Sequence, residues 1–348
     1  MEFNILDKSR VWIGVIDHFK SAIWTSRYYD VGDFELYVEA TTINLSLLQP
    51  DFFVTREDDD MACIIEKINI VTDADGGNYI IVTGRSLSCI LARRIIWTQT
   101  TLQGTVEDCI RQLISENVIS PNITERKIDN FFLKEKHDFS ERLEMQMTGD
   151  NLLDAVMKLC KSYEYGFKIT FNDARQFIFE LYDGANRSYN QTENQFVVFS
   201  PNFDNVKSVE YSSDKTGYKN VALVAGEGEG LARKTMSVGN DSGFNRREIY
   251  VDARDLSTNE NEISPDEYNK LLTERGNESL VENTIVESFE GEVEPVMNYT
   301  YKTDYFLGDI IQIENEFGIS AAPRILEIIE CEDENGYSLT PTFSSQEG

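Results

Sequence analysis

The chain has 348 residues, which is too long for one ordinary domain and fits two or three. Its 61 acidic and 32 basic residues give a formal net charge of −29. A surface of this sign repels phosphate and disfavours specific binding to nucleic acids or anionic membranes, although the same charge is equally well explained as a means of keeping the protein soluble.

The first hundred residues have the alternating pattern of β-strands. RVWIGVID (10–17) places Val11, Ile13 and Val15 on one face, and FELYVE (34–39) alternates apolar and polar residues. MACIIEKINIVT (61–72) and NYIIVTGR (78–85) are joined by DADGG, whose Asp and Gly residues favour a hairpin turn. LSCILARRII (87–96) is predicted to form a short helix that leaves the sheet.

The middle of the chain has helical patterns instead. TVEDCIRQLISENVI (105–119) opens with Thr105 and Asp108 in capping-box spacing and then places apolar residues on one helical face. NLLDAVMKLCKSYEYG (151–166) predicts a second helix that stops at Gly166. FKITF and QFIFELY, joined by NDAR, then predict a hairpin over residues 167–182. We therefore expect an α+β insertion at 101–194.

From residue 195 the chain returns to strands, with one further helix. SPDEYNKLLTERGNESL (264–280) begins with Ser264 as the cap, Pro265 in the first turn and Glu267 three residues after the cap. ENG at 334–336 predicts another hairpin. The fold class predicted from these patterns is α+β and mainly β.

No set of residues suited to catalysis or to binding a cofactor or metal emerges. The two histidines, His18 and His137, have no Cys or His at metal-ligand spacing, and neither HExxH nor GxSxG occurs. DADGG lacks the later ligands of a calcium loop. The five cysteines are odd in number, contain no CxxC and are expected to be reduced, four of them inside apolar patterns; they are Cys63, Cys89, Cys109, Cys160 and Cys331.

Further absences limit the class of protein. No apolar run approaches the ~20 residues needed to cross a bilayer, so we expect no membrane-spanning segment. The N-terminus does not have the pattern of a signal peptide, which predicts synthesis in the cytoplasm. The three tryptophans lie in apolar patterns and are expected in cores rather than on a sugar-binding surface; they are Trp12, Trp24 and Trp97.

One short pattern occurs twice, near the two ends of the chain. DVGDFELYV (30–38) and YFLGDIIQI (305–313) each run a Gly-Asp pair into an alternating strand. Two unrelated strand starts would explain the coincidence. The alternative is that the repetition has a structural reason.

Seven segments, in order and over nearly the whole chain, resemble siphophage and prophage tail proteins of the baseplate-hub class. These segments are RVWIGVIDHFKSAIWTSRYYDVGDFELYVEA (10–40), GRSLSCILARRII (84–96), TGDNLLDAVMKLCKSYEYGFKITF (148–171), YDGANRS (182–188), NFDNVKSVEYSSDKTGYKNVALVAGEGEG (202–230), RREIYVDARDLS (246–257) and DYFLGDIIQIENEFGISAAPRILEIIE (304–330). The resemblance also extends to the N-terminal portion of tail-associated proteins, to contractile-phage hubs and to the spike bases of type VI secretion systems.

The resemblance implies a structural protein with two tube-like β-barrel domains, rather than an enzyme. The first barrel is expected at 1–100, completed by strands from about 195–230. The α+β insertion follows at 101–194, then strands and the helix at 195–283, and the second barrel at 284–348. Three chains would form a ring that presents six similar units. The two Gly-Asp starts would lie in the two tube-like domains as an internal duplication, with Gly32 and Gly308 allowing a tight approach of the backbone and Asp33 and Asp309 making turn hydrogen bonds. These four residues are the candidate assembly residues.

The resemblance also implies a place and partners. The expected location is the virion tail tip, and the expected partners are the distal tail protein, the tape-measure protein and the tail fibre or tip proteins. DNA would pass through the acidic ring without specific binding. Because the sequence ends at PTFSSQEG, soon after the last expected strand, no wall-degrading module is expected. The alternatives are a tail-associated cell-wall hydrolase and a carbohydrate-binding β module.

Overall fold

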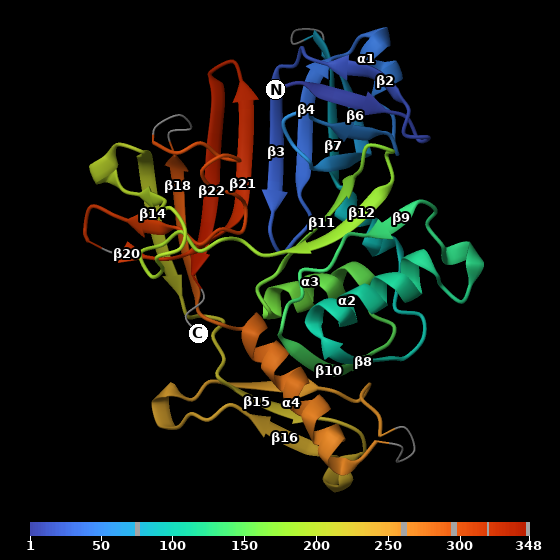
Figure 1. Ribbon diagram of the computed structural model, residues 1–348, viewed down its shortest axis with the longest axis vertical. Helices are drawn as coiled ribbons and strands as arrows, with labels where there is room; N and C mark the ends of the chain where they lie inside the picture. Colours follow the sequence, from blue (N-terminus) through green and yellow to red (C-terminus); the bar gives the residue numbers. More distant parts are fainter. Residues whose placement is uncertain (74–76, 259–262, 294–297, 319, 346–348) are drawn as a thin grey trace.

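The computed structural model describes residues 1–73, 77–258, 263–293, 298–318 and 320–345. Figure 1 shows four bodies: the N-terminal lobe, the C-terminal lobe beside it, the insertion, and a lobe built around helix α4. The chain is mainly β with few helices, so the α+β, mainly β class is confirmed. No helix in these residues is apolar over a length that would span a bilayer.

One sheet of eleven strands runs through both the N-terminal and the C-terminal lobe. Its order is β14 (Val206–Asp214), β18 (Val286–Val293), β22 (Gly336–Ser345), β21 (Arg324–Asp333), β3 (Ser21–Arg27), β4 (Asp33–Glu39), β7 (Gly77–Ser86), β6 (Ala62–Asp73), β5 (Phe53–Thr55), β1 (Phe3–Leu6) and β2 (Trp12–Ile16). The lobes meet where β21 pairs with β3 in antiparallel register, from Glu327 opposite Arg27 to Glu332 opposite Ala22.

A four-strand order occurs twice in this sheet. In the N-terminal lobe, β3 pairs with β4, β4 with β7 and β7 with β6, all antiparallel. In the C-terminal lobe, β14 pairs with β18, β18 with β22 and β22 with β21, again all antiparallel. If the four strands of each unit are numbered along the chain, both units have the order first, second, fourth, third across the sheet. The fold therefore contains two four-stranded units of the same topology, placed in tandem.

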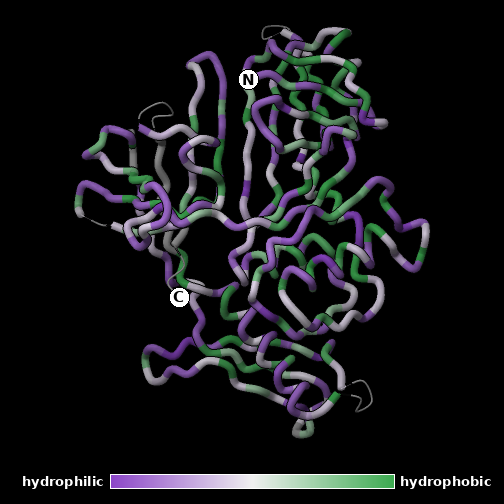
Figure 2. The backbone as a smooth tube through the Cα atoms, in the orientation of Figure 1, coloured by the Kyte–Doolittle hydropathy of each residue, from purple (hydrophilic) through white to green (hydrophobic). Residues whose placement is uncertain are grey.

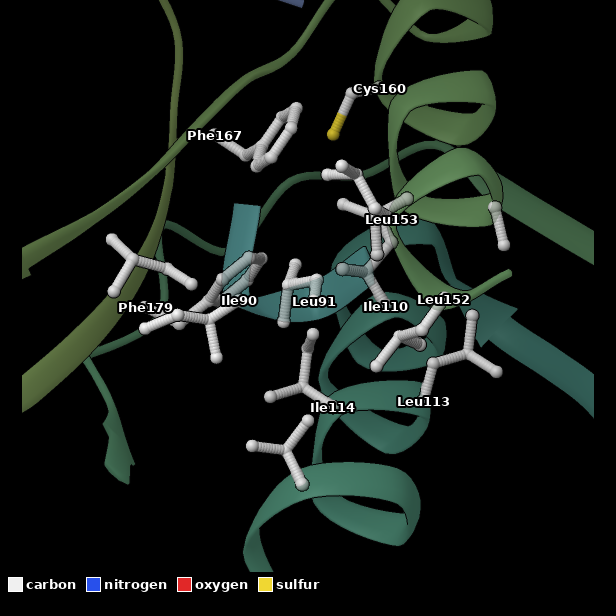
Figure 3. Close-up of a cluster of buried hydrophobic side chains, with 14 of the residues drawn as sticks. Ile90, Leu91, Ile110, Leu113, Ile114, Leu152, Leu153, Cys160, Phe167 and Phe179 are labelled. Carbon is white, nitrogen blue, oxygen red and sulfur yellow. The ribbon is translucent and has the colours of Figure 1, made fainter. Parts of the chain in front are cut away.

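The insertion holds the two predicted helices and the predicted hairpin. Thr105 caps α2 (Val106–Ile114), which continues as a π-helical turn (Ser115–Ile119), and Asn151 caps α3 (Leu152–Ser162). Strands β11 (Gly166–Phe171) and β12 (Phe177–Tyr182) pair as a hairpin, β9 (Phe131–Leu133) joins β12, and β8 (Thr100–Thr105) pairs with β10 (Arg142–Met147). Figure 3 shows how α2, α3, the 3-10 helix Leu87–Arg93 and the hairpin bury one core.

The α4 lobe is a separate layer. Ser264 and Glu267 form the predicted capping box of α4 (Pro265–Glu282), whose apolar side chains cover one face of the sheet β16-β15-β17. Those strands are β16 (Thr235–Val238), β15 (Val221–Ala225) and β17 (Glu248–Asp252). The other regular elements include a small sheet of β13 (Val198–Phe199), β19 (Gln312–Glu314) and β20 (Ser320–Ala321) and the short helix α1 (Thr42–Leu47).

Several expectations need correction. The described strands of the large sheet leave two separate ends, β14 and β2, so the two closed barrels are not confirmed. Strands from 195–230 do not complete the first unit: β13 and β14 pair with C-terminal strands, and β15 lies in the α4 lobe. Gly166 does not end α3, which stops at Ser162; it begins β11 instead.

The burial of side chains at residues 10–17 and at two tryptophans also differs from the prediction. Val11, just before β2, is 55% exposed, and Trp12 at the start of β2 is 51% exposed. Strand β2 is the outermost strand of the sheet. Trp97 is 56% exposed, whereas Trp24 is fully buried as expected. The turn within DADGG falls largely outside the described residues, but Asp73 pairs with Gly77 as a hairpin requires. The ENG hairpin is confirmed between β21 and β22, and Figure 2 shows its tip as hydrophilic.

Candidate functional site

The two Gly-Asp pairs occupy different positions in the repeated unit. Gly32 and Asp33 lead into β4, the second strand of the first unit, whose counterpart by order is β18. Gly308 and Asp309 precede β19, between the second and third strands of the other unit. The strand order is thus duplicated, while the Gly-Asp pairs are not at equivalent positions.

Both glycines allow close approaches that a larger residue would prevent. A Cβ atom at Gly32 would lie 2.4 Å from the carbonyl oxygen of Thr25. At Gly308, where φ is +93°, a Cβ would lie 2.3 Å from the ring of Tyr28. The carboxylate of Asp33 accepts a hydrogen bond from Arg27, and no turn hydrogen bond to Asp33 is found among the described residues.

Tyr28 connects three of the four bodies, and we call its surroundings the Tyr28 joint. It follows β3, its backbone N–H donates to the carbonyl of Leu326 in the C-terminal lobe, and its carbonyl accepts from Phe167 of the insertion. Its buried hydroxyl lies 3.0 Å from the carbonyl oxygen of Glu164 and 3.2 Å from Oδ1 of Asp183. Burial raises the pKa of this hydroxyl, which therefore remains a neutral donor.

Arg324 covers the other side of the joint. Its guanidinium lies 5.3 Å from the centroid of the Tyr28 ring, and its Nη1 donates to the carbonyl of Gly308 at 2.7 Å. The same group forms ion pairs with Glu164 and Asp183. Burial opposes its charge, but Tyr28, Tyr29 and these acids leave the pKa of Arg324 above its ordinary value. Arg324 therefore fastens the C-terminal lobe to the insertion as a permanent cation.

Asp309 makes a second connection to the insertion. Its side chain is 3% exposed and accepts hydrogen bonds from the backbone of Ala185 at 2.7 Å, from Nε of Arg187 at 2.6 Å and from the backbone of Phe306 at 3.0 Å. The last is the turn hydrogen bond that the sequence predicted for this residue. The hydrogen bonds from Ala185 and Arg187 hold the segment that follows β12 against the segment that precedes β19.

A third group of charges links the loop after β5 to β21. Arg56 contacts Asp58 and, at 3.0 Å, the buried carboxylate of Glu330. Glu330 also accepts from the Tyr337 hydroxyl at 2.8 Å, and Lys302 lies 3.4 Å away. Burial opposes the charge of Arg56, but the two acids raise its pKa above the ordinary value. Buried charges paired in this way fix the relative position of the two lobes.

Members of these groups line a cavity of about 720 Å³ at the meeting point of the lobes, among them Asp58, Asp183, Arg187 and Lys302. Gly32 and Asp309 both line it, so the structure brings one residue of each Gly-Asp pair to the same space. Three of its carboxylates, Asp309, Asp59 and Asp60, are paired with Arg187, Lys302 and Lys168, and no group of metal-binding side chains occurs within the described residues. These paired charges hold the lobes together around the cavity.

The face of the sheet opposite the buried side chains of Trp24, Phe34 and Ile328 carries more acids than bases among the described residues. Residues paired across strands lie on the same face of a sheet. The pairings of β4 with β3 and β7, and of β3 with β21, show which residues share this face with Asp33, Glu35 and Glu39. Its acids include Asp33, Glu35, Glu39, Glu210, Glu327 and Asp333, and its bases are Arg27, Lys67 and Arg85. Hydroxyls of Ser338, Thr340 and Thr342 occupy β22.

Sequence reasoning missed Tyr28, Arg324 and Arg187. Their roles depend on partners more than a hundred residues away in the sequence, as in the bond from Tyr28 to Glu164 and the pair of Arg187 with Asp309. The only local signal is that glycines at 166 and 308 lack side chains where the Tyr28 ring packs.

The fold is similar to that of solved tail proteins. A tail protein from Neisseria meningitidis MC58 gives a TM-score of 0.59 at 12% identity, covering 99% of this chain and 96% of that one. The 43 kDa tail protein of prophage MuSo2 from Shewanella oneidensis gives 0.58 at 12% identity, with 99% and 98% covered. Prophage tail protein gp18 from Listeria monocytogenes EGD-e gives 0.56 at 14% identity, with 100% and 96% covered.

No curated protein sequence matches the chain. The sequence profile of one family, described as Siphovirus ReqiPepy6 Gp37-like protein, matches residues 2–343, which is almost the whole chain. This match confirms the resemblance to phage tail proteins that the seven segments suggested. The chain belongs to the family of Siphovirus ReqiPepy6 Gp37-like proteins.

Proposed function

We propose that the protein is a hub or adaptor at the distal end of a phage or prophage tail tube, where three chains form a ring and the tail tip is mounted. The observation that carries this proposal is the tandem pair of four-stranded units, which gives three chains six similar units. A ring of this kind matches a six-membered tube on one side and a threefold tip on the other.

The free edges of the sheet support ring closure. Within one chain, the third strand of the C-terminal unit, β21, pairs with the first strand of the N-terminal unit, β3. The corresponding strands left for a neighbour are β6 and β14. Strand β14 pairs only with β18 among the described strands, and β5 covers only Ala62–Ile64 of β6. Pairing β6 of one copy with β14 of the next would repeat the internal contact.

The charge of the sheet supports a conduit for DNA. The face with more acids is the one that lies opposite the cores, and curling the sheet into a tube-like wall would turn it toward the lumen. Carboxylates such as Glu35 and Glu327 would then repel the phosphates of passing DNA. The expected neighbours are the distal tail protein, the tape-measure protein and the fibre or tip proteins.

The first test is assembly. The full chain is co-expressed with the distal tail protein of the same gene cluster, and the complex is examined by light scattering and cryo-electron microscopy. We expect three copies in a ring with β6 beside β14. Ile70, which is 56% exposed on β6, is changed to Lys, and Ile43, 69% exposed on α1, to Lys as the control. Only Ile70→Lys should prevent ring formation. Rings with another copy number, or with a basic lumen, would contradict the proposal.

The second test addresses the enzyme alternative. The purified chain is run in a zymogram that contains Gram-positive cell walls. We expect no clearing, because Asp309, Asp60 and Asp59 of the cavity are paired with Arg187, Lys168 and Lys302. A cleared band at the mass of the chain would replace the hub proposal with a tail-associated hydrolase.

A further inference from the structure

A second concave site lies on the insertion, away from the eleven-stranded sheet. It is a groove of about 370 Å³ between the segment that precedes β8 and the π-helical end of α2. This volume is within the range of small-molecule sites. The groove shares no residue with the cavity at the Tyr28 joint. π-helical turns occur frequently at functional sites.

Trp97 provides an aromatic surface in this groove. The residue is 56% exposed. The Arg126 guanidinium lies 5.2 Å from the centroid of the indole ring and is itself held by the Ile95 carbonyl and by Oδ1 of Asn117. The backbone N–H of Trp97 also donates to Asn117. The ring is therefore fixed in place and still open to solvent.

The remaining lining is polar and almost uncharged. Eight of its twelve side chains are amides or alcohols, and the charged ones are Glu116 and Arg126. Gln112 donates to one oxygen of Glu116 at 2.8 Å and Thr100 lies 3.3 Å from the other, so that carboxylate is oriented by neighbours. The chain has a net charge of −29, but the charges of the one acid and the one base in this groove cancel, so the groove itself is neutral.

This combination favours one class of ligand. Phosphates and nucleic acids would need several cations, and a divalent metal would need more than one carboxylate. Amides and hydroxyls both donate and accept, which suits the hydroxyl groups of a sugar, and a solvent-facing indole suits the flat C–H face of a pyranose ring. We propose that the groove is a binding site for a neutral saccharide, with Trp97 as the stacking platform and Gln112, Glu116 and Asn122 as hydrogen-bonding partners.

The inference does not depend on the hub proposal, because the groove uses none of the strands or edges expected to close the ring. It would give a tail protein a contact with the glycans of a bacterial surface. It also reverses the sequence expectation for Trp97, whose apolar neighbourhood predicted a core position.

The test uses the full chain and saturation-transfer NMR with a panel of neutral trisaccharides of glucose, galactose, rhamnose and N-acetylglucosamine. We expect transfer to at least one of them, a shift of tryptophan fluorescence on binding, and an affinity at least tenfold weaker in Trp97→Ala. Trp97→Phe should keep part of the affinity, because a smaller aromatic surface remains. Gln112→Ala should weaken binding without removing the platform.

Trp12→Ala is the matched control, since Trp12 is 51% exposed but lies on β2 of the N-terminal lobe. It should bind the saccharide as the unmodified chain does. Absence of transfer to every trisaccharide, or equal binding by Trp97→Ala, would overturn the proposal. Ring formation is measured on the same variants and should be unchanged, so failure of the saccharide site is distinguishable from failure of the hub.

Discussion

Two regions of the molecule join separate bodies, and they differ in what crosses the boundary. At the Tyr28 joint, a backbone ladder between β21 and β3 continues the same sheet, and a buried aromatic ring is enclosed by Gly166, Gly308 and Arg324. Within the described residues, the α4 lobe shares no ladder with that sheet. Its helix is fastened to α3 by Lys158, which lies 2.9 Å from Glu278 and 3.5 Å from Glu282.

The difference indicates which parts move as one. A ladder with buried charges has one satisfactory geometry, because any displacement leaves polar groups unpaired. The ion pairs of Lys158 hold the α4 lobe through side chains alone, and a long flexible side chain follows a displacement more easily than a backbone ladder does. We therefore expect the two sheet lobes and the insertion to behave as one rigid unit, and the α4 lobe to be more loosely attached.

High pH should break the Tyr28 joint. Burial raises the pKa of Tyr28 and Tyr182 above the value of an unfolded tyrosine, about 10. Their contribution to stability is fully present below pH 10 and is lost as the pH rises above it, by up to about 1.4 kcal/mol per pH unit and group. Urea unfolding between pH 8 and 11.5 should show this fall. Tyr28→Phe should flatten the slope, whereas Tyr250→Phe, half-exposed in the α4 lobe, should not.

Removing the central ring should have the next largest effect. Tyr28→Ala leaves a cavity among Gly166, Gly308 and Arg324, and should lower the free energy of unfolding by about 3–5 kcal/mol. Chemical denaturation followed by circular dichroism measures this loss. Tyr29→Ala, at the neighbouring and only partly buried position, is the control. Equal losses in the two variants would mean that the joint does not depend on the Tyr28 ring.

Gly308→Ala should also destabilise the joint, by about 2–4 kcal/mol. The new Cβ would lie 2.3 Å from the Tyr28 ring, and φ of +93° is strained for alanine. Gly149 has a similar φ of +79° but has no atom near a Cβ, so Gly149→Ala should lose only about 1 kcal/mol. The difference in unfolding free energy between the two variants isolates the contact with the ring. A difference near zero would contradict the proposed close packing.

Local signals predicted the helices, and long-range contacts account for what the sequence did not predict. Ser264 and Glu267 lie three residues apart and form the capping box in the structure, because a cap needs only its own helix. Gly166 had the pattern of a helix end, but its small size serves the ring of Tyr28, which is far away in the sequence. No local pattern could identify that partner.

The strands followed the same rule. Hairpins such as β21–β22 were predicted from their turns, whereas the pairing of β21 with β3, about 300 residues apart, has no local signature. The candidate site at the joint is made of such pairings. Asp309 was predicted from the sequence, and the structure shows it with a turn hydrogen bond. Arg324 and Tyr28 were not predicted and were found only in the structure.

The smallest effect is expected at the α4 lobe, where Lys158→Met should remove its ion pair with Glu278. Because Lys158 is partly exposed and Arg275 lies 3.8 Å from the same carboxylate, the loss of global stability should be only about 1 kcal/mol. Hydrogen exchange should nevertheless speed up in α4 and not in β3 or β21. Lys161→Met, on an exposed turn of α3, is the control and should change neither rate. Faster exchange throughout β3 would mean that the α4 lobe is part of the rigid unit, because opening at one boundary would then have reached the other.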